Sequence, residues 1–360
     1  MSGMLSAADA DAALEQLHAA RCTDGLPVVI PTAPRVARMV LAGGLDGDLV
    51  IGEMGPLGGA ATIEKIAIAA VMAGCIPDYF PVVLAACRAI CQPAFDLTEM
   101  QSTTHCIAPL IIVNGPARGA CGLAHGFGLM GPGHRANASI GRALRLAMIN
   151  IGGARPGESD MALHGHPAKF TFCIAEDEAA SPFPPLHTSF GYDAAQSAVT
   201  VVGVAGPHST FFASDGDDPQ AAERLLNTLA IALANPGNNN AHLGGNAAMV
   251  IVLNPDHARL LSAAGHTREI IQQELSRRAT TPRSVLSALN TKMLMGSGDP
   301  LPAARNPANI HVLTAGGGGL YSMVMPSWCA GPHGNVAVHE EVVLGQACEV
   351  PWARQPAEAS

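Results

Sequence analysis

Charge is the scarcest ingredient of this 360-residue chain. Only 14% of its residues are charged, whereas 48% are hydrophobic; an average globular protein has about 25% charged residues. A surface this poor in charge predicts that another polypeptide covers part of it. The simplest cover is a second copy of the chain, because obligate homo-oligomer interfaces resemble a domain core cut in half. We therefore expect a homo-oligomer.

Basic residues are few and dispersed. The chain has 20 lysines and arginines and a net charge of −9, and its only lysines are Lys65, Lys169 and Lys292. Proteins that bind nucleic acids carry clustered Lys and Arg side chains that neutralise phosphates. Because no such cluster is present, a nucleic-acid partner is not expected.

Long apolar runs and a secretion signal are lacking as well. The longest apolar stretch, residues 66–76, spans 11 residues, and a helix that crosses a bilayer needs about 20. The first 21 residues carry acidic side chains in an Ala-rich helical pattern, which is unlike a signal peptide. The nine cysteines include no CxxC pair, as expected of free thiols in a reducing compartment. We expect a cytoplasmic protein with no membrane partner.

Helical and strand patterns alternate along the chain, which predicts an α/β fold with mixed sheets and buried apolar helices. Strands are expected at 27–30, 48–53, 108–113, 169–175 and 198–205. Helices are expected at 7–21, 34–41, 63–74 and 80–91, and a further helix is expected to end at about residue 151. Beyond residue 215 the strands at 248–253 and 309–314, with helices between them, predict a smaller α/β unit. We divide the chain into a main catalytic part, 1–215, and this unit, 216–360, with a boundary between 215 and 245. No internal repeat is apparent.

The densest group of polar residues within apolar sequence is the segment 164–178. His164 and His166 would point the same way in an extended chain, which suits a shared metal ion or anionic substrate. In the strand expected at 169–175, Lys169 and Cys173 share one face, and Glu176 follows the strand end. A cysteine near a cation gains thiolate character, and a carboxylate can be a general acid or base. The alternative is a buried cysteine followed by a solvated acidic turn.

His105 precedes the strand expected at 108–113 and follows two threonines. It is either a satisfied core histidine or a catalytic or metal-binding one. The neighbouring Cys106 is not predicted to pair with it, because adjacent side chains diverge.

Two glycine-rich stretches are further candidates for ligand binding. Residues 122–133 lead into a helix that begins near Arg135, and a loop at a helix start presents free N–H groups to an anion. Arg135 and Arg142 would add charge there, or they would pair with acidic residues of the protein. Residues 316–319 are four glycines that let a ligand approach the backbone at Gly317, or that form a plain turn. No GK[ST] phosphate loop, HExxH or GxSxG motif is present.

Several longer motifs resemble those of an uncharacterised bacterial family associated with UGSC-type (selenocysteine/cysteine) proteins. They are TDGLPV at 23–28, GGAATIEKIA at 58–67, RANASIGR at 135–142 and GHPAKFTFCIAE at 165–176. The resemblance covers most of the chain, which nevertheless has no GSC segment. It implies a bacterial metabolic enzyme without a settled reaction. It also supports one set of positions as candidates for a functional site: Asp24, Glu64, Lys65, His105, Asn114, Arg135, Asn137, His166, Lys169, Cys173 and Glu176.

These observations predict a hydrolase or lyase that acts on a small polar, anionic or heterocyclic molecule. The expected catalytic residues are Cys173, Glu176, His166, His105, Lys169, Glu64 and Lys65, and the expected substrate-binding residues are Asp24, Asn114, Arg135, Asn137, Arg142 and Gly317. Two alternatives stay open. A divalent metal ion could be held by His105, His164 or His166 with a carboxylate, or the chain could be a non-catalytic subunit of a thiol or selenol redox complex.

Overall fold

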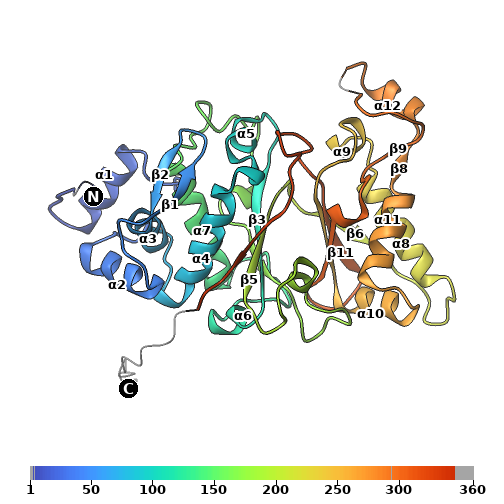
Figure 1. Ribbon diagram of the computed structural model, residues 1–360, viewed down its shortest axis with the longest axis horizontal. Helices are drawn as coiled ribbons and strands as arrows, with labels where there is room; N and C mark the ends of the chain where they lie inside the picture. Colours follow the sequence, from blue (N-terminus) through green and yellow to red (C-terminus); the bar gives the residue numbers. More distant parts are fainter. Residues whose placement is uncertain (1–2, 4, 293, 345–360) are drawn as a thin grey trace.

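The central strands are apolar on both faces, and a different layer covers each face. In β3 (Ala108–Asn114), Ile111 and Val113 face helices, whereas Leu110 and Ile112 face a second sheet. Strands that are buried on both sides read as continuous apolar runs. The result is the predicted α/β fold, with four layers in the order helices, sheet, sheet, helices (Figure 1). The structure is a computed structural model that describes residue 3, residues 5–292 and residues 294–344.

Two mixed four-stranded sheets form the middle layers. Their strand orders are β12-β5-β3-β4 and β10-β7-β11-β6. The first sheet contains β3, β4 (Cys173–Ala175), β5 (Ala198–Val204) and β12 (Val338–Glu341). The second contains β6 (His208–Phe211), β7 (Met249–Leu253), β10 (Ile310–Thr314) and β11 (Tyr321–Met325). In each sheet one parallel pair, β3 with β4 or β7 with β10, is followed by two antiparallel pairings.

The two sheets have the same connectivity, and they exchange one strand each. After β5 the chain crosses to the edge of the second sheet as β6, and after β11 it crosses back to the edge of the first as β12. Equivalent backbone bonds follow the parallel strands, from Glu176 N to Val113 O at 3.3 Å and from Ala315 N to Leu253 O at 3.0 Å. The topology is therefore repeated although no repeat is apparent in the sequence, and a single cut near residue 215 does not separate the two sheets.

Apolar helices cover the outer face of each sheet. On the first sheet lie α3 (Ile63–Met72), α4 (Phe80–Cys91) and α7 (Arg135–Asn150). On the second lie α8 (Ala221–Leu233), α10 (Pro255–Ala263) and α11 (Arg268–Arg278). Side-chain caps start three of them: Thr62 accepts from Lys65 N, Asn254 from Asp256 N and His257 N, and Thr267 from Ile270 N.

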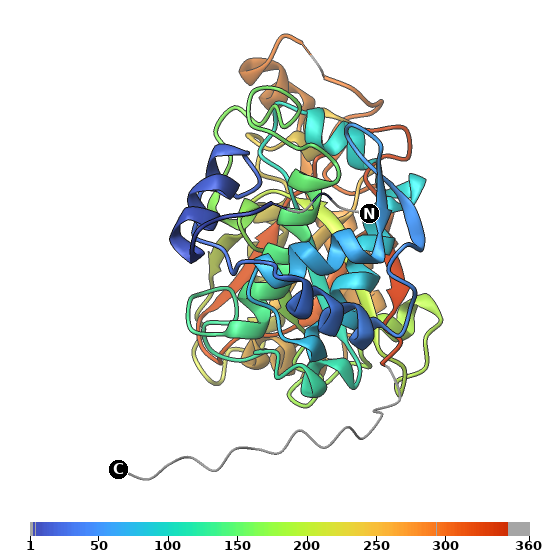
Figure 2. The ribbon, with the colours of Figure 1, turned by 90° about the vertical axis from the view of Figure 1, so that its left-hand side faces the viewer.

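Short elements surround these layers. The helices among them are α1 (Ala10–Ala19), α2 (Ala33–Gly43), α5 (Leu97–Ser102), α6 (Ala117–Ala120), α9 (Asn239–His242) and α12 (Arg283–Leu289). The two-stranded sheets are β1 (Val50–Met54) with β2 (Gly59–Thr62) and β8 (Thr280–Thr281) with β9 (Leu301–Pro302). In Figure 2 the N-terminal helices α1 and α2 lie outside the helices that cover the first sheet. Within the described residues no single helix is long and apolar enough to cross a membrane, although the bent pair Pro77–Cys91 and Pro93–Ser102 passes on length and composition.

Two expected strands differ from the structure. Residues 27–30 form no strand, and Val29 N donates instead to the carbonyl of Met72 at the end of α3. The strand expected at 169–175 begins only at Cys173, because Pro167–Lys169 forms a turn of 3-10 helix, η3. Pro167 is the first residue of that turn, where its fixed φ favours a helical start.

Candidate functional site

The polar groups of the segment 164–178 are divided between the two ends of the first sheet. β3 and β4 run parallel, with Ile111 opposite Cys173. His166 therefore lies at the amino end of β4, near His105, which precedes β3, whereas Glu176 follows the carboxyl end of β4. Because a seven-residue strand is roughly 20 Å long, these groups do not form one site. The expected convergence on a single strand is wrong.

The amino-end cluster consists of His105, Cys106, Arg145, Asp160, His166 and Lys169. His166 makes a backbone hydrogen bond with Cys106, and it lies within the electrostatic reach of Lys169, Arg145 and His105. Lys169 in turn interacts electrostatically with the Cys106 thiol. Cys106 and Lys169 are far apart in sequence, and they lie near each other because η3 brings the chain back beside the start of β3.

Asp160 fixes the cationic side of the amino-end cluster. Its carboxylate is buried and accepts from Lys169 Nζ at 2.7 Å, and Arg145 NH1 lies 3.6 Å away. Arg145 Nε also donates to the carbonyl of Lys169 at 2.6 Å. Burial, followed by the nearby Arg145 charge, lowers the pKa of Lys169. The ammonium is thus held by the Asp160 carboxylate, which it shares with the neighbouring Arg145 guanidinium.

The two histidines of the cluster have complementary hydrogen bonds. Asn239 Nδ2 donates to His105 Nδ1 at 3.2 Å, so the neutral ring carries its proton on Nε2. In His166, Nε2 is buried and has no hydrogen-bond partner in the described part of the chain. Desolvation lowers the pKa of both rings. At neutral pH the cluster therefore offers the Nε2–H donor of His105 and a buried His166 nitrogen without a hydrogen-bond partner.

The second half of the chain completes the surroundings of this cluster. Asn239 belongs to α9, and its amide also donates to the carbonyl of Trp328 at 3.3 Å. Gly206, in the crossover from β5 to β6, passes so close to the His166 ring that a Cβ there would lie 3.5 Å from Nδ1. A β-bridge joins Val204 to Ser327 where the two crossovers meet. The cluster thus sits where the two sheets exchange strands.

A second polar group, the carboxyl-end network, follows β3 and β4. Glu176 is fully buried and accepts from Asn114 Nδ2 at 2.5 Å and from Leu186 N at 2.7 Å, and Arg268 NH2 lies 3.4 Å away. Glu178 pairs with Arg118 at 2.6 Å. Burial raises the pKa of Glu176 despite the Arg268 charge. Asn114 and Glu176 meet, and their buried contacts tie loops to strand ends, although Asn114 Oδ1 has no hydrogen-bond partner in the described part of the chain.

Cys173 lies in an apolar environment. Its side chain faces the core between α3, α4, α7 and the first sheet, and burial raises the pKa of its thiol, with Cys121 and Cys75 nearby. A buried thiol with a raised pKa resists forming the thiolate that nucleophilic attack requires. Cys173 is therefore a buried cysteine, which was the alternative to a catalytic role.

Four of the expected substrate-binding residues, Asp24, Arg135, Asn137 and Arg142, make their contacts within the protein. Arg142 forms two bonds of 2.8 Å with the carboxylate of Asp24, which is itself buried. Arg135 Nε and NH2 donate to the carbonyl of Gly74. Asn137 bonds both backbone groups of Ala124 and the Cys173 carbonyl. These side chains join segments of the protein through hydrogen bonds and an ion pair.

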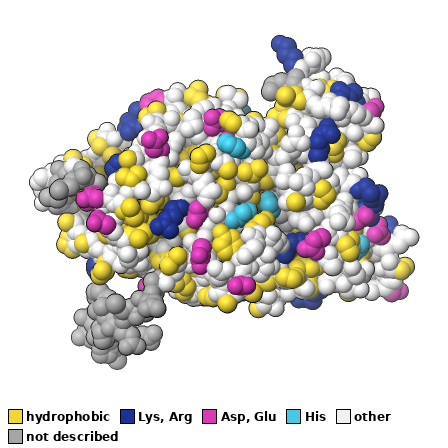
Figure 3. Space-filling view, in the orientation of Figure 1, with side chains coloured by type: hydrophobic (Ala, Val, Ile, Leu, Met, Phe, Trp, Pro, Cys, Tyr) yellow, Lys and Arg dark blue, Asp and Glu magenta, His cyan; other side chains and the backbone are white. Residues whose placement is uncertain are grey.

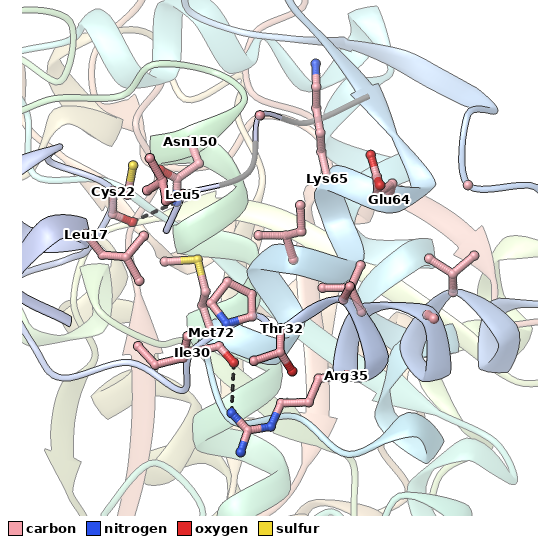
Figure 4. A pocket seen from close by; sticks show the side chains of 18 of the residues that line it. Leu5, Leu17, Cys22, Ile30, Thr32, Arg35, Glu64, Lys65, Met72 and Asn150 are labelled. Carbon is pink, nitrogen blue, oxygen red and sulfur yellow. Dashed lines mark hydrogen bonds between the residues drawn. The ribbon is translucent and has the colours of Figure 1, made fainter. Parts of the chain in front are cut away.

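Glu64 and Lys65 lie elsewhere again, at one end of an apolar cleft of about 1350 Å³ between α1, α2 and α3 (Figure 4). Lys65 Nζ donates to the carbonyl of Ala60 at 2.9 Å. Leu17, Ile30 and Met72 line the interior of this cleft. Neither residue joins the amino-end cluster.

The remaining expected residues do not add a metal centre. His164 is exposed, whereas His166 is half-buried, so the two imidazoles do not share a site. Gly317 packs under Phe127, where a Cβ would lie 2.2 Å from the ring. Across the residues that the structure describes, no group of three or more His, Cys, Asp or Glu side chains is arranged to hold a metal ion.

Sequence reasoning missed Asp160, Arg145 and Arg268, and it set Cys106 aside. A local signal existed only for Asp160, which lies in a polar loop before the histidines. Arg268 follows a capping threonine and looks like a solvated first-turn residue, yet only 2% of its surface is exposed. The other two depend on contacts that no local pattern reports.

Charged side chains are scattered singly over the face shown in Figure 3, without a large patch of either sign. In comparisons with known proteins, no family model matches this chain and no curated protein is significantly similar to it. The resemblance to UGSC-associated proteins therefore stays a prediction.

Proposed function

We propose that this chain is an enzyme, a hydrolase or lyase for a small anionic molecule, and that its reaction takes place at the amino-end cluster. The observation that carries the proposal is the gathering of His105, Cys106, His166 and Lys169 at the amino ends of the parallel strands β3 and β4, where Lys169 is bonded to Asp160 at 2.7 Å and His105 to Asn239 at 3.2 Å. Titratable groups with shifted pKa values gather at active sites more often than elsewhere. The buried positions of Glu176 and Cys173 argue for this cluster over the carboxyl-end network.

The hydrogen bonds support a proposed role for each group. His166 Nε2 is free to take the proton of the Cys106 thiol as its sulfur attacks an electrophilic carbon of the substrate. His105 carries its proton on Nε2 and can pass it to the leaving group. Lys169, held by Asp160, would attract an anionic substituent of the substrate. In a hydrolase, water would then release the group bound to sulfur.

We also propose that the protein works in a reducing compartment such as the cytoplasm. All eight cysteines in the described part of the chain are free. A thiol nucleophile needs this environment, since oxidation would block it.

A panel of small carboxylated esters, amides and heterocycles tests the proposal. Turnover by the full chain should be lost in Cys106→Ser and fall strongly in His166→Asn. Cys173→Ser is the matched control, because that thiol is buried on the helical side of β4 and should leave turnover near the wild-type rate in folded protein. Full turnover in Cys106→Ser would remove the nucleophile, and loss of turnover only in Cys173→Ser would reverse the assignment.

A metal-assisted reaction predicts a different result in the same assay. Turnover that disappears on chelation and returns with a divalent ion, while Cys106→Ser stays active, would favour a metal site that includes His105 or His166.

A further inference from the structure

A small cleft between α4, β1 and β12 is lined by two opposite charges that do not pair with one another. Its volume is about 490 Å³, and Arg88 and Glu340 both line it. Arg88 is half-buried and makes no hydrogen bond or ion pair with any residue that the structure describes. A half-buried guanidinium without a partner is unusual, because its five N–H donors normally find acceptors.

Glu340 is the negatively charged residue that lines the cleft. It belongs to β12, is half-buried, and one of its oxygens accepts from the amide of Gln92. Its other oxygen has no hydrogen-bond partner in the described part of the chain. The cleft therefore offers a donor fork and a carboxylate oxygen, both unused.

The chain builds this cleft through a close approach of β1 to α4. Gly52 makes it possible, since a Cβ at that position would lie 2.8 Å from Cβ of Cys91. The approach brings Leu49, Val50 and Ile51 over the last turn of α4 as an apolar wall. Carbonyls at the end of a twelve-residue helix also carry partial negative charge, which favours a cation there.

From these features we propose that the cleft is a binding site for a small zwitterion, an aliphatic α-amino acid. Its carboxylate would take the two-pronged bond that Arg88 offers. Its ammonium would meet Glu340 and the carbonyl end of α4, and its side chain would lie against the wall of β1. The cleft shares no residue with the amino-end cluster, so this proposal does not depend on the proposed function.

Three probes separate the two charges of the ligand. L-leucine carries both, 4-methylpentanoate has only the carboxylate, and isoamylamine has only the ammonium. Titration of the full chain, followed by calorimetry and by ligand-detected NMR at pH 7 and low salt, should give a Kd on the order of 1 mM or lower for leucine, and at least about tenfold weaker binding for the other two.

Variants locate the site. Arg88→Gln and Glu340→Gln should each weaken leucine binding about tenfold or more, the change expected for one lost charge-assisted bond. Glu340→Gln can keep its contact with Gln92, so that variant also tests the charge if Arg88→Gln fails to fold. Arg38→Gln is the matched control, because Arg38 is exposed on α2 and lines neither cleft.

Three results would overturn the proposal. They are no leucine binding at about ten times the expected Kd, equal affinity for either single-charge analogue, or a loss in Arg38→Gln equal to that in Arg88→Gln.

Discussion

Asn239 Nδ2 lies 3.2 Å from Nδ1 of His105, although 134 positions separate the two residues. The bond joins α9 of the second half to the segment before β3 of the first. It also sets which nitrogen of the His105 ring carries the proton. The exchange of strands between the sheets is what brings these segments together.

Replacing Asn239 by leucine should therefore change the tautomer of His105. The variant lacks the amide that donates to Nδ1 of His105. The tautomer with its proton on Nε2 is then no longer favoured over the tautomer with its proton on Nδ1. ¹⁵N NMR of the imidazoles at pH 7.5 checks this, with about tenfold slower proposed turnover as the second readout. Asn238→Leu, one position earlier, is the control. An unchanged His105 spectrum in Asn239→Leu would contradict the assigned bond.

Loss of the Arg268 charge should destabilise the fold strongly. Arg268→Met leaves the Glu176 carboxylate buried without its cation, and removal of one partner of a buried ion pair costs about 3–5 kcal/mol. Arg277→Met, on the same helix but 65% exposed at the side chain, should cost less than about 1 kcal/mol. Urea unfolding measures both free energies, and equal values would mean that the buried pair contributes little.

Acid should weaken the contact between the two sheets. Burial lowers the pKa of His311 to about 3 and that of His339 to about 4, and Phe190 stacks on His339. Because both pKa values lie below those of the unfolded chain, near 6.5, the stability is fully present above about pH 6.5. It is lost as pH falls towards 4 and then 3, at up to about 1.4 kcal/mol per pH unit for each histidine.

Urea unfolding between pH 7 and pH 4 measures this slope. His311→Phe keeps an aromatic ring next to Phe190 but cannot bind a proton, so its free energy of unfolding should fall less steeply with pH than that of the wild type. Identical slopes would show that His311 is not the proton acceptor.

The cleft between α1 and α2 is our candidate for self-association with a second copy of the chain. Leu41 and Leu5 line it with 78% and 66% of their surfaces exposed, and the chain as a whole is poor in charge. Light scattering should give a mass above the 36.8 kDa of one chain, and Leu41→Glu should lower it. Ile231→Glu is the control, since Ile231 is 74% exposed on α8 and lies outside the cleft. A monomeric wild type would contradict the expectation.

Local signals predict the elements that depend on local chemistry. The helices predicted at 63–74 and 80–91 are α3 and α4, and the strand predicted at 108–113 matches β3 within one residue. The shortened β4 shows the limit of such signals, because Pro167 starts a 3-10 turn inside a stretch whose composition favours a strand.

The candidate site depends on pairing between distant segments. The sequence identifies His105, His166 and Lys169, but not their association with Cys106, which requires the parallel register of β3 and β4. The same register separates Glu176 from these residues. A composition pattern cannot show which end of a strand a flanking residue occupies relative to another strand, and the exchange of β6 and β12 leaves no local signal at all.

The most direct test of the account is the rate at which each cysteine reacts with iodoacetamide, followed by peptide mass spectrometry on the folded wild type and on His166→Asn. Cys106 should be alkylated well before Cys173, and its rate should fall in His166→Asn because the nearby base is gone. Alkylation of Cys106 no faster than Cys173, or a rate that His166→Asn leaves unchanged, would contradict the proposal that the amino-end cluster is the active site.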